Sequence, residues 1–397
     1  MPPTDAADTA AARPRSRRAL MIAPTPYFAD RGCHVRILEE ARALQANGVD
    51  VTIAAYPLGR TIPGIETVRT VKIPWYRKLE AGPSVHKIYI DGLLWGLVLR
   101  EIRRRKPDVL HAHLHEGAAI GIAARALTGV PVVFDIQGSL ADEMAAHGAV
   151  RPGGAAFRAL TAIERRLYRW SDALIVNSEA ARAMLAEKFS VPEARMHVAP
   201  DAAGVPDRAP DPAAVRKELG VDGGPVIGYL GLMTEYQGVG TLVDAIPKIL
   251  EKRPDARVLM MGFPDEAYRR RVADAGLAHA VRFTGRVPYE EIGRYLSAVD
   301  VAVSPKVIST EGNGKLFTYL AMGLPTVAFD TPINREIIGS NGVLVSPISP
   351  DALAEALVRA LDSPPATRSD SGALSWDDAV AGTLRAYDDA IARRGRR

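Results

Sequence analysis

Short apolar runs alternate with longer amphipathic segments along most of this 397-residue chain. In the first half, runs with the length and composition of buried strands occupy 19–23, 49–54, 108–113, 130–136 and 173–176. Between them, the periodicity of helices buried on one face is found at 35–45, 88–104, 118–127 and 155–169. The second half repeats the alternation, with strands expected at 225–231, 257–261, 281–285, 301–303 and 326–329 and helices at 239–252, 289–298 and 315–322. Strands that alternate with helices predict an α/β protein with parallel sheets.

A proline-rich segment separates the two halves. Prolines stand at 200, 206, 210 and 212, so we expect a linker over 201–212. The chain is too long for one compact core. We therefore expect two doubly wound, Rossmann-like domains, over 19–200 and 213–365, which face each other across a cleft at the carboxyl ends of their strands. A last helix is expected over 376–394.

Composition and charge narrow the class of protein. The net charge of +4 comes from the ends of the chain: the first 18 residues carry +2 and the last five carry +4, so the remainder carries −2. This distribution gives little support to nucleic-acid binding. The single cysteine, Cys33, excludes an internal disulfide and fits a reducing compartment. Residues 1–18 lack the apolar core of a signal peptide and are expected to form a disordered tail. No apolar run is long enough to span a membrane, so we expect a cytoplasmic protein.

The most informative segment lies between the strands expected at 301–303 and 326–329. There the loop Glu311-Gly312-Asn313-Gly314 leads directly into a helix that begins near Lys315. Such a loop presents backbone N–H groups and the positive end of a helix dipole to one point, and glycines let an anion approach closely. Lys315 adds a full positive charge, and Glu311 places a carboxylate beside it. An ordinary helix start has the same local pattern, but the combination favours a site for a phosphate attached to a polar group.

Common nucleotide-binding motifs are missing from the sequence. No GxGxxG follows the first predicted strand, and GxxxxGK[ST] does not occur. A nicotinamide-dependent dehydrogenase and a P-loop ATPase are therefore disfavoured.

A set of short motifs, in this order, resembles the retaining glycosyltransferases of family four, which have the GT-B fold. The resemblance runs from about residue 19 to the last helix. In the first half it rests on Arg31-Gly32, on NGVDV at 47–51 and on KPDVLHAH at 106–113. In the second half it rests on GYLG at 228–231, FTGRVPY at 283–289, AVD at 298–300 and YLAMGLP at 319–325. The resemblance also implies that helix 376–394 crosses back to pack on the first domain.

This family implies transfer of a sugar from a nucleotide-diphosphate donor to a hydroxyl acceptor, with retention at the anomeric carbon and without a metal or other cofactor. The departing phosphate is expected to take the acceptor's proton, and the site must stabilise the charge that develops on the diphosphate. In such a site we expect two catalytic residues. Glu311, one position after the place of a family glutamate, would hydrogen-bond the donor sugar, and His113, at the cleft end of its strand, would contact donor or acceptor unless it is an ordinary core histidine. The resemblance implies a donor site formed by Gly32, Gln137, Gln237, Lys306, Asn313, Gly314, Lys315, Leu316 and Thr318.

Several family positions are substituted in this chain. Leu232 and Gln237 occupy the places of an Arg and a Lys that contact the diphosphate, Thr318 that of a glutamate that holds the ribose, and Gln137 that of a histidine near the sugar. Because three of these four residues are polar, we favour a rebuilt donor site, in which Lys306 and Lys315 supply the missing charge, over an inactive homologue.

Three histidines, at 111, 113 and 115, alternate along a predicted strand, with Glu116 next to the last of them. Alternation puts side chains on one face, so a metal site is one interpretation. The strand is expected to end near His113, and no second cluster in the sequence offers the remaining ligands, so we expect no metal. Cys33-His34 could suggest a thiol nucleophile, but neighbours in sequence do not converge in space, and a cysteine at a helix start is the more usual case.

The expected partners are a nucleotide sugar and an acceptor, which is a sugar, a lipid-linked molecule or a small hydroxyl compound. Basic clusters at 103–106 and 165–169, with Trp75, Tyr76 and Trp170, suggest peripheral contact with the inner face of the plasma membrane. Basic residues at solvent-exposed helix ends form similar clusters without contacting a membrane, so this alternative stays open. Two other functions stay open on this fold: a sugar-nucleotide epimerase or phosphorylase, and an inactive glycan-binding relative.

Overall fold

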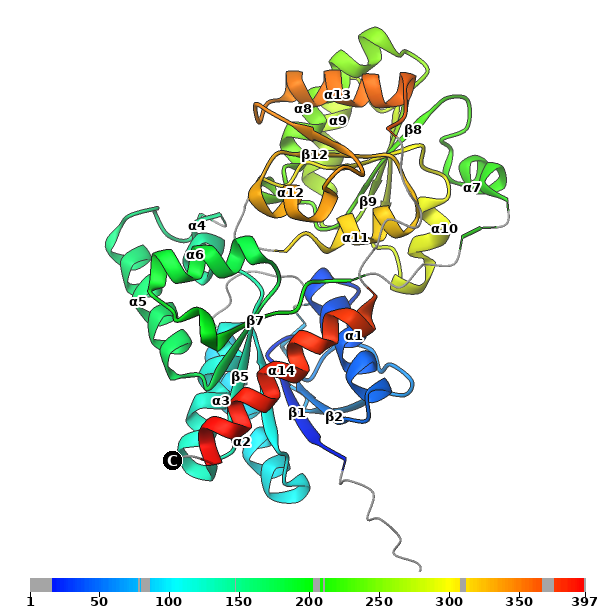
Figure 1. Ribbon diagram of the computed structural model, residues 1–397. Helices are drawn as coiled ribbons and strands as arrows, with labels where there is room; N and C mark the ends of the chain where they lie inside the picture. The colour runs from blue at the N-terminus through cyan, green and yellow to red at the C-terminus, as the bar shows by residue number, and fades with distance from the viewer. Residues whose placement is uncertain are drawn as a thin grey trace, which may run out of the picture.

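The computed structural model describes residues 16–77, 79, 86–146, 148–202, 208–209, 211–307, 312–365 and 375–395. These residues form two α/β lobes, each built on a parallel sheet (Figure 1). This arrangement confirms the predicted fold class.

The first sheet has the strand order β3-β2-β1-β4-β5-β6-β7. Its strands are β1 (Arg18–Ala23), β2 (Asp50–Ala55), β3 (Glu66–Arg69), β4 (Val109–His113), β5 (Val132–Ile136), β6 (Ala173–Val176) and β7 (Met196–Val198). The helices of this lobe are α1 (Gly32–Ala46), α2 (His86–Arg105), α3 (Leu114–Thr128), α4 (Leu140–Ala146), α5 (Ala155–Trp170) and α6 (Glu179–Phe189). The order reverses between β1 and β4, and such a switch point is where doubly wound sheets bind ligands.

The second sheet has the order β10-β9-β8-β11-β12-β13, with its switch point between β8 and β11. Its strands are β8 (Val226–Leu230), β9 (Arg257–Met261), β10 (Val281–Gly285), β11 (Val301–Ser304), β12 (Thr326–Phe329) and β13 (Val343–Val345). The helices are α7 (Pro212–Leu219), α8 (Val239–Lys252), α9 (Glu266–Asp274), α10 (Ile292–Leu296), α11 (Gly314–Ala321), α12 (Pro332–Ile338) and α13 (Pro350–Asp362).

Both faces of each sheet are buried, as the unbroken apolar runs predict. On β1, Leu20 and Ile22 belong to one core cluster, whereas Met21 and Ala23 belong to another on the opposite face. On β8, Ile227 and Val226 likewise belong to different clusters. Successive side chains of a strand point to opposite faces, so a strand of this kind is covered by helices on both sides.

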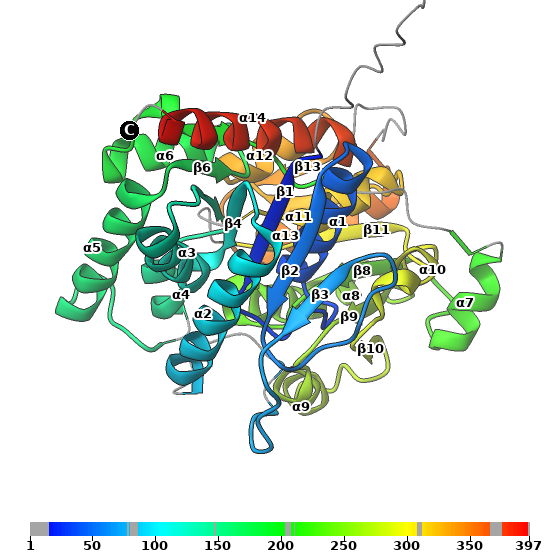
Figure 2. The same cartoon turned by 90° about the horizontal axis from the view of Figure 1, so that it is seen from below.

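The last helix, α14 (Trp376–Gly395), returns to the first lobe (Figures 1 and 2). It packs against α1, β6 and β7. Gly382 sits directly against the backbone there, since a Cβ at this position would lie 2.1 Å from the carbonyl oxygen of Val198. The chain thus crosses between the lobes twice, once before α7 and once before α14.

Some boundaries and elements differ from the sequence-based expectation. Pro212, expected in the linker, is the first residue of α7, where Asp211 caps the helix through the amide of Ala214. Residues 1–15 of the expected disordered tail lie outside the described residues, and Arg18 is the first residue of β1. The periodicity did not single out β3, β7, β13, α4, α6, α7, α9, α12 or α13. Most of these are short. The two longest, α6 and α13, directly follow Ser178 and Ser349, whose side chains cap them.

Candidate active site

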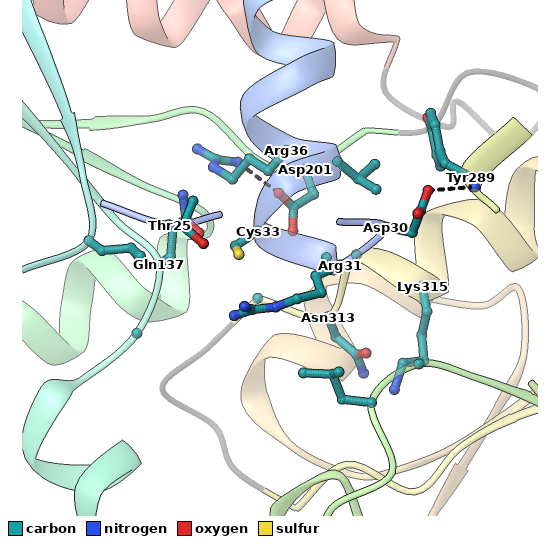
Figure 3. Close-up of a pocket in the computed structure, with 18 of the residues that line it drawn as sticks. Thr25, Asp30, Arg31, Cys33, Arg36, Gln137, Asp201, Tyr289, Asn313 and Lys315 are labelled. Carbon is teal, nitrogen blue, oxygen red and sulfur yellow. Dashed lines mark hydrogen bonds and ion pairs between the residues drawn. The ribbon is translucent and has the colours of Figure 1, made fainter. Parts of the chain in front are cut away.

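A cavity of about 660 Å³ lies between the lobes (Figure 3). Its walls include residues that follow β1 and β4 in the first sheet, such as Thr25 and Leu114, and residues that follow β8 and β11 in the second, such as Gly231 and Lys306. Both switch points therefore open into one space. Asp30 and Leu114, which line it, have φ angles of 47° and 60°. Backbone conformations of this kind are uncommon for residues other than glycine and collect at functional sites.

The loop before α11 forms the wall of the cavity on the second lobe. Asn313 is buried. Its side-chain nitrogen Nδ2 donates to Ser304 Oγ at 3.0 Å and to Asn334 Oδ1 at 2.7 Å. These bonds fix the loop at the entrance to the helix. Gly314 and Lys315 are the first two residues of α11, and N–H groups at these positions have no acceptor within a helix. Both residues line the cavity, so this wall presents backbone donors to a ligand.

Lys315 extends along the same wall. Its ammonium group donates to Gln237 Oε1 at 2.8 Å and lies 4.7 Å from the centre of the Tyr229 ring. It passes close to Gly231, where a Cβ would lie 3.1 Å from Lys315 Nζ. Gly231 in turn touches Gly262, at which a Cβ would lie 1.8 Å from the Gly231 carbonyl oxygen. A side chain at position 262 would therefore displace the Gly231 backbone, which lies beside the lysine.

Lys306 is only 3% exposed, and its ammonium group donates to the Gly312 carbonyl at 2.7 Å. This hydrogen bond stabilises the loop before α11, and part of Lys306 also lines the cavity. Leu316 is placed differently from the expectation. Its amide donates to the Asn313 carbonyl at 2.9 Å, and its side chain belongs to the core under the helix. The amide is therefore engaged within the loop, and Leu316 is not among the described residues that line the cavity.

The first lobe contributes a buried ion-pair network that starts on α1. The Arg36 guanidinium donates to both carboxylate oxygens of Asp135, at 2.9 and 3.0 Å, and to Asp201 Oδ1 at 2.8 Å. Burial alone would raise the pKa of Asp135, but Arg36 and His113 hold it well below its usual value. Asp201 also faces the loop before α11, since a Cβ on Gly312 would lie 2.9 Å from its Oδ2. The residue that begins the expected linker therefore connects the two walls.

Arg31, at the start of α1, reaches into the cavity from the first lobe. In the view of Figure 3 the Arg31 and Lys315 side chains lie on either side of Asn313. One guanidinium nitrogen of Arg31 donates to the Leu79 carbonyl at 3.0 Å, while its Nε has no hydrogen-bond partner among the described residues. Gly32 and Cys33 follow it on the same wall.

His113 lies beneath the cavity wall rather than on it. Its side chain is fully buried, and its Nδ1 is 3.0 Å from Asp135 Oδ2. Burial and the neighbouring His111 lower its pKa, although Asp135 opposes the shift. Gln137 does line the cavity and donates to the same oxygen of Asp135 at 2.9 Å. A direct contact of His113 with substrate, expected from the sequence, is therefore not supported by this geometry, whereas Gln137 is placed for one.

Gln237 and Thr318 both line the cavity on the second lobe. Glu311 lies outside the described residues, so its expected role remains a prediction. The sequence reasoning missed Arg31 and Asp201. Arg31 directly precedes Gly32, which the sequence did indicate. Its position in the loop after the first strand could have marked it as a site residue. No local pattern marks Asp201.

One end of the cavity lies entirely in the first lobe. Tyr56, Lys87, Glu116 and Glu143 line it. Lys87 Nζ donates to Glu116 Oε1 at 2.6 Å, so its charge is already paired. Behind this wall the hydroxyl of Tyr56 donates to Asp91. Burial raises the pKa of Asp91 to about 6, although the bond from Tyr56 opposes the shift.

The Asp91→Asn variant is expected to be more stable than the parent protein above about pH 6. The unfolded chain releases the Asp91 proton near its usual pKa of 3.8, but the folded protein does so only near 6. Stability is therefore lost as the pH rises from about 4 to about 6, and an amide suffers no such loss. Urea-unfolding midpoints between about pH 4 and pH 7 would measure it. The exposed Asp274→Asn change serves as the control, and parallel pH profiles for the two variants would contradict the expectation.

The surface expected to contact a membrane is only partly exposed. Trp75 and Trp170 are 70% and 53% exposed, but Tyr76 is buried and cannot take part. Arg104 and Arg105 form ion pairs with Glu66 and Glu101 on the protein itself. Ile88, Tyr89, Leu93 and Trp95 add exposed apolar side chains along α2, next to the end of the cavity that Lys87 lines. Among the described residues, no helix combines the length and apolarity needed to cross a bilayer.

Two family models match this chain, and each of them covers one of the two lobes. Residues 224–363 match the family model for glycosyl transferases group 1, and residues 31–202 match a glycosyl transferase 4-like domain. The chain is 30% identical to a 2-deoxystreptamine glucosyltransferase of Streptomyces kanamyceticus, over 83% of this chain and 89% of that protein. It is 27% identical to a D-inositol 3-phosphate glycosyltransferase of Acidothermus cellulolyticus, over 91% and 86% of the two chains. The structure of sucrose-phosphate synthase from Thermosynechococcus elongatus superposes with a TM-score of 0.70 at 20% identity, over 96% of this chain and 98% of that one.

Proposed function

Because this chain belongs to the group 1 glycosyltransferases, we propose that its cavity binds the nucleoside diphosphate sugar with the diphosphate at the start of α11 and transfers the sugar with retention of its anomeric configuration. The observation that carries this proposal is the convergence of the Gly314 and Lys315 amides and the Lys315 ammonium group on a cavity that both sheets line. Preorganised donors aimed at the leaving oxygens stabilise the charge that develops as the glycosidic bond breaks.

Charge compensation in this site is shared between the lobes. The second lobe offers Lys315 but has Leu232 and Gln237 where relatives of this family place cations. Arg31 approaches from the first lobe and lines the same cavity. We assign Arg31 and Lys315 to the two sides of the diphosphate. Lys306 supports the loop from below, Gln137 faces the transferred sugar, and Gln237 orients Lys315. No residue of this donor site requires a metal for its role.

The acceptor is assigned to the end of the cavity lined by Tyr56, Lys87, Glu116 and Glu143. Two relatives are named for 2-deoxystreptamine and for inositol 3-phosphate, both polyhydroxylated rings. The two differ in charge, because the first carries amines and the second a phosphate. Two carboxylates and one paired lysine favour an amine or an uncharged polyol over a phosphate. We therefore propose a compact polyol acceptor without phosphate.

The exposed apolar row on α2 favours a second candidate, an acceptor carried on a lipid, since large exposed apolar patches mark interaction sites. Sedimentation with vesicles that contain anionic lipid tests it. Binding that is lost when Ile88 and Trp95 are both changed to serine would support a lipid-linked acceptor. Equal recovery in the supernatant with and without vesicles would reject it.

The donor can be identified without knowing the acceptor. UDP, GDP and ADP are compared for the rise in melting temperature that they produce, since a ligand at 100 times its Kd stabilises by about 2.7 kcal/mol. The matching nucleotide sugars are then incubated with 2-deoxystreptamine, myo-inositol or inositol 3-phosphate. Transfer to either of the first two with little transfer to the third is expected, and the proton coupling of the new anomeric centre reports retention. Isomerised donor without acceptor would indicate an epimerase, phosphate-dependent release of sugar 1-phosphate a phosphorylase, and no stabilisation by any nucleotide an inactive relative.

A further inference from the structure

A second cluster of polar side chains is buried within the first lobe, beneath the cavity. It comprises Glu40 on α1, His111 and His113 on β4, and Asp135 on β5. Each offers a potential metal-ligand atom, and these atoms lie within 4.8 Å of one another. All four side chains are at most 2% exposed. The residues do not appear among those that line the cavity, so the donor and acceptor sites do not account for them.

Three atoms of this cluster have no hydrogen-bond partner within the described part of the chain. They are Glu40 Oε2, His111 Nε2 and His113 Nε2. Buried polar atoms are nearly always paired in folded proteins, so three such atoms in one cluster require an explanation. His111 Nε2 and Glu40 Oε2 face each other at 3.8 Å, which is too long for a hydrogen bond but close to the separation of two ligands on one ion.

In Glu40, His111 and His113, the second polar atom of the side chain has a hydrogen-bond partner. Asp135 Oδ2 lies 3.0 Å from His113 Nδ1, and the Tyr387 hydroxyl lies 2.8 Å from His111 Nδ1. The Thr383 hydroxyl donates to Glu40 Oε1. When Asp135 and Tyr387 accept the Nδ1 protons, each imidazole directs the lone pair of its Nε2 into the cluster. Metal-binding histidines are oriented by outer partners in this way.

We propose that His111, His113 and Glu40 bind a divalent transition-metal ion, with zinc as the best fit to two imidazoles and one carboxylate. Alternating histidines on a strand place both rings on one face, and here the ring centres are 4.3 Å apart. The local charge agrees with a divalent cation. Glu40, Asp135 and Asp201 against Arg36 give a formal charge of −2, which a divalent ion neutralises.

The ion would serve structure rather than the transfer reaction. Its ligands come from α1 and β4, and Tyr387 and Thr383 tie it to α14. It would thus lock the returning C-terminal helix onto the first lobe, directly behind Arg36. This inference does not depend on the proposed donor or acceptor.

Metal content of the untagged protein, purified without added metal or chelator, is the first test. About one equivalent of zinc is expected by mass spectrometry of the digested protein, and Co²⁺ loading should give the visible absorption bands of a tetrahedral site. Anomalous scattering at the zinc edge would then place the ion at His111 and His113. Less than a tenth of an equivalent, with no uptake of Zn²⁺ or Co²⁺ after refolding, would overturn the proposal and indicate a buried water instead.

Two variants separate this site from adventitious binding. Tyr387→Phe preserves the ring and removes the hydroxyl that orients His111, so metal affinity is expected to fall about 10- to 100-fold. Changing the exposed His279 to asparagine should leave the metal content unchanged. Equal affinity in the Tyr387→Phe variant and the parent would contradict the assignment. Because the metal content of the parent is measured independently, a folding defect in a variant does not obscure the result.

Discussion

Replacing Lys315 by alanine is expected to lower kcat/KM by roughly 10- to 150-fold. A hydrogen bond to a charged group contributes about 1.5–3 kcal/mol, and the contact should strengthen as charge develops on the diphosphate. Lys315 is held in position by Gln237 and by the face of Tyr229, so alanine removes an oriented cation rather than a mobile one. Initial rates at varied donor concentration, with a saturating acceptor, measure the loss.

Binding measurements locate the effect on the phosphates. The Lys315→Ala variant should lose more affinity for a nucleoside diphosphate than for the corresponding monophosphate, as titration calorimetry would report. Lys252→Ala, on the exposed end of α8, is the matched control and should leave both affinities unchanged. Equal losses for the two nucleotides would remove Lys315 from the diphosphate site and, with it, the main support for the proposed donor orientation.

The sequence carried enough information to predict this wall of the site. Strand β11, the glycine-rich loop and helix α11 are contiguous in the chain, so local rules for helix starts placed Asn313, Gly314 and Lys315 together. The same rules could not distinguish the amide of Lys315 from that of Leu316. That difference depends on the last turn of the loop, in which Asn313 accepts the Leu316 amide.

The wall on the first lobe was less predictable because its contacts connect distant parts of the chain. Arg36 meets Asp135 and Asp201, which are 99 and 165 positions away. Within α1, Arg36 has the pattern of an ordinary exposed helix residue, and nothing in its neighbours marks it as buried. The histidine alternation on β4 was visible, but Glu40 lies on another element and enters the cluster only through packing of α1 on the sheet. Side-chain clusters that need three elements cannot be read from one segment.

Replacing Arg36 by methionine is expected to destabilise the first lobe by about 3–5 kcal/mol, because the change leaves the fully buried Asp135 without its counter-ion. The four tryptophans, at 75, 95, 170 and 376, belong to the first lobe or to the helix that packs on it, so intrinsic fluorescence during urea unfolding reports on this lobe. The exposed pair of Arg335 and Asp330 provides the control, and Arg335→Met should leave the stability almost unchanged.

The pH dependence of the stability lost in Arg36→Met tests whether the unpaired Asp135 carboxylate causes the loss. In the parent protein the pKa of Asp135 lies well below its usual value, so the stability it contributes is present above about pH 4 and is lost only as the pH falls through the low pKa of the folded state. Without Arg36 the buried carboxyl should take up a proton much more readily. The difference in stability between Arg36→Met and the parent should therefore shrink as the pH is lowered toward 4. A difference that stays constant over this range would mean that lost packing, rather than an unpaired carboxylate, causes the destabilisation.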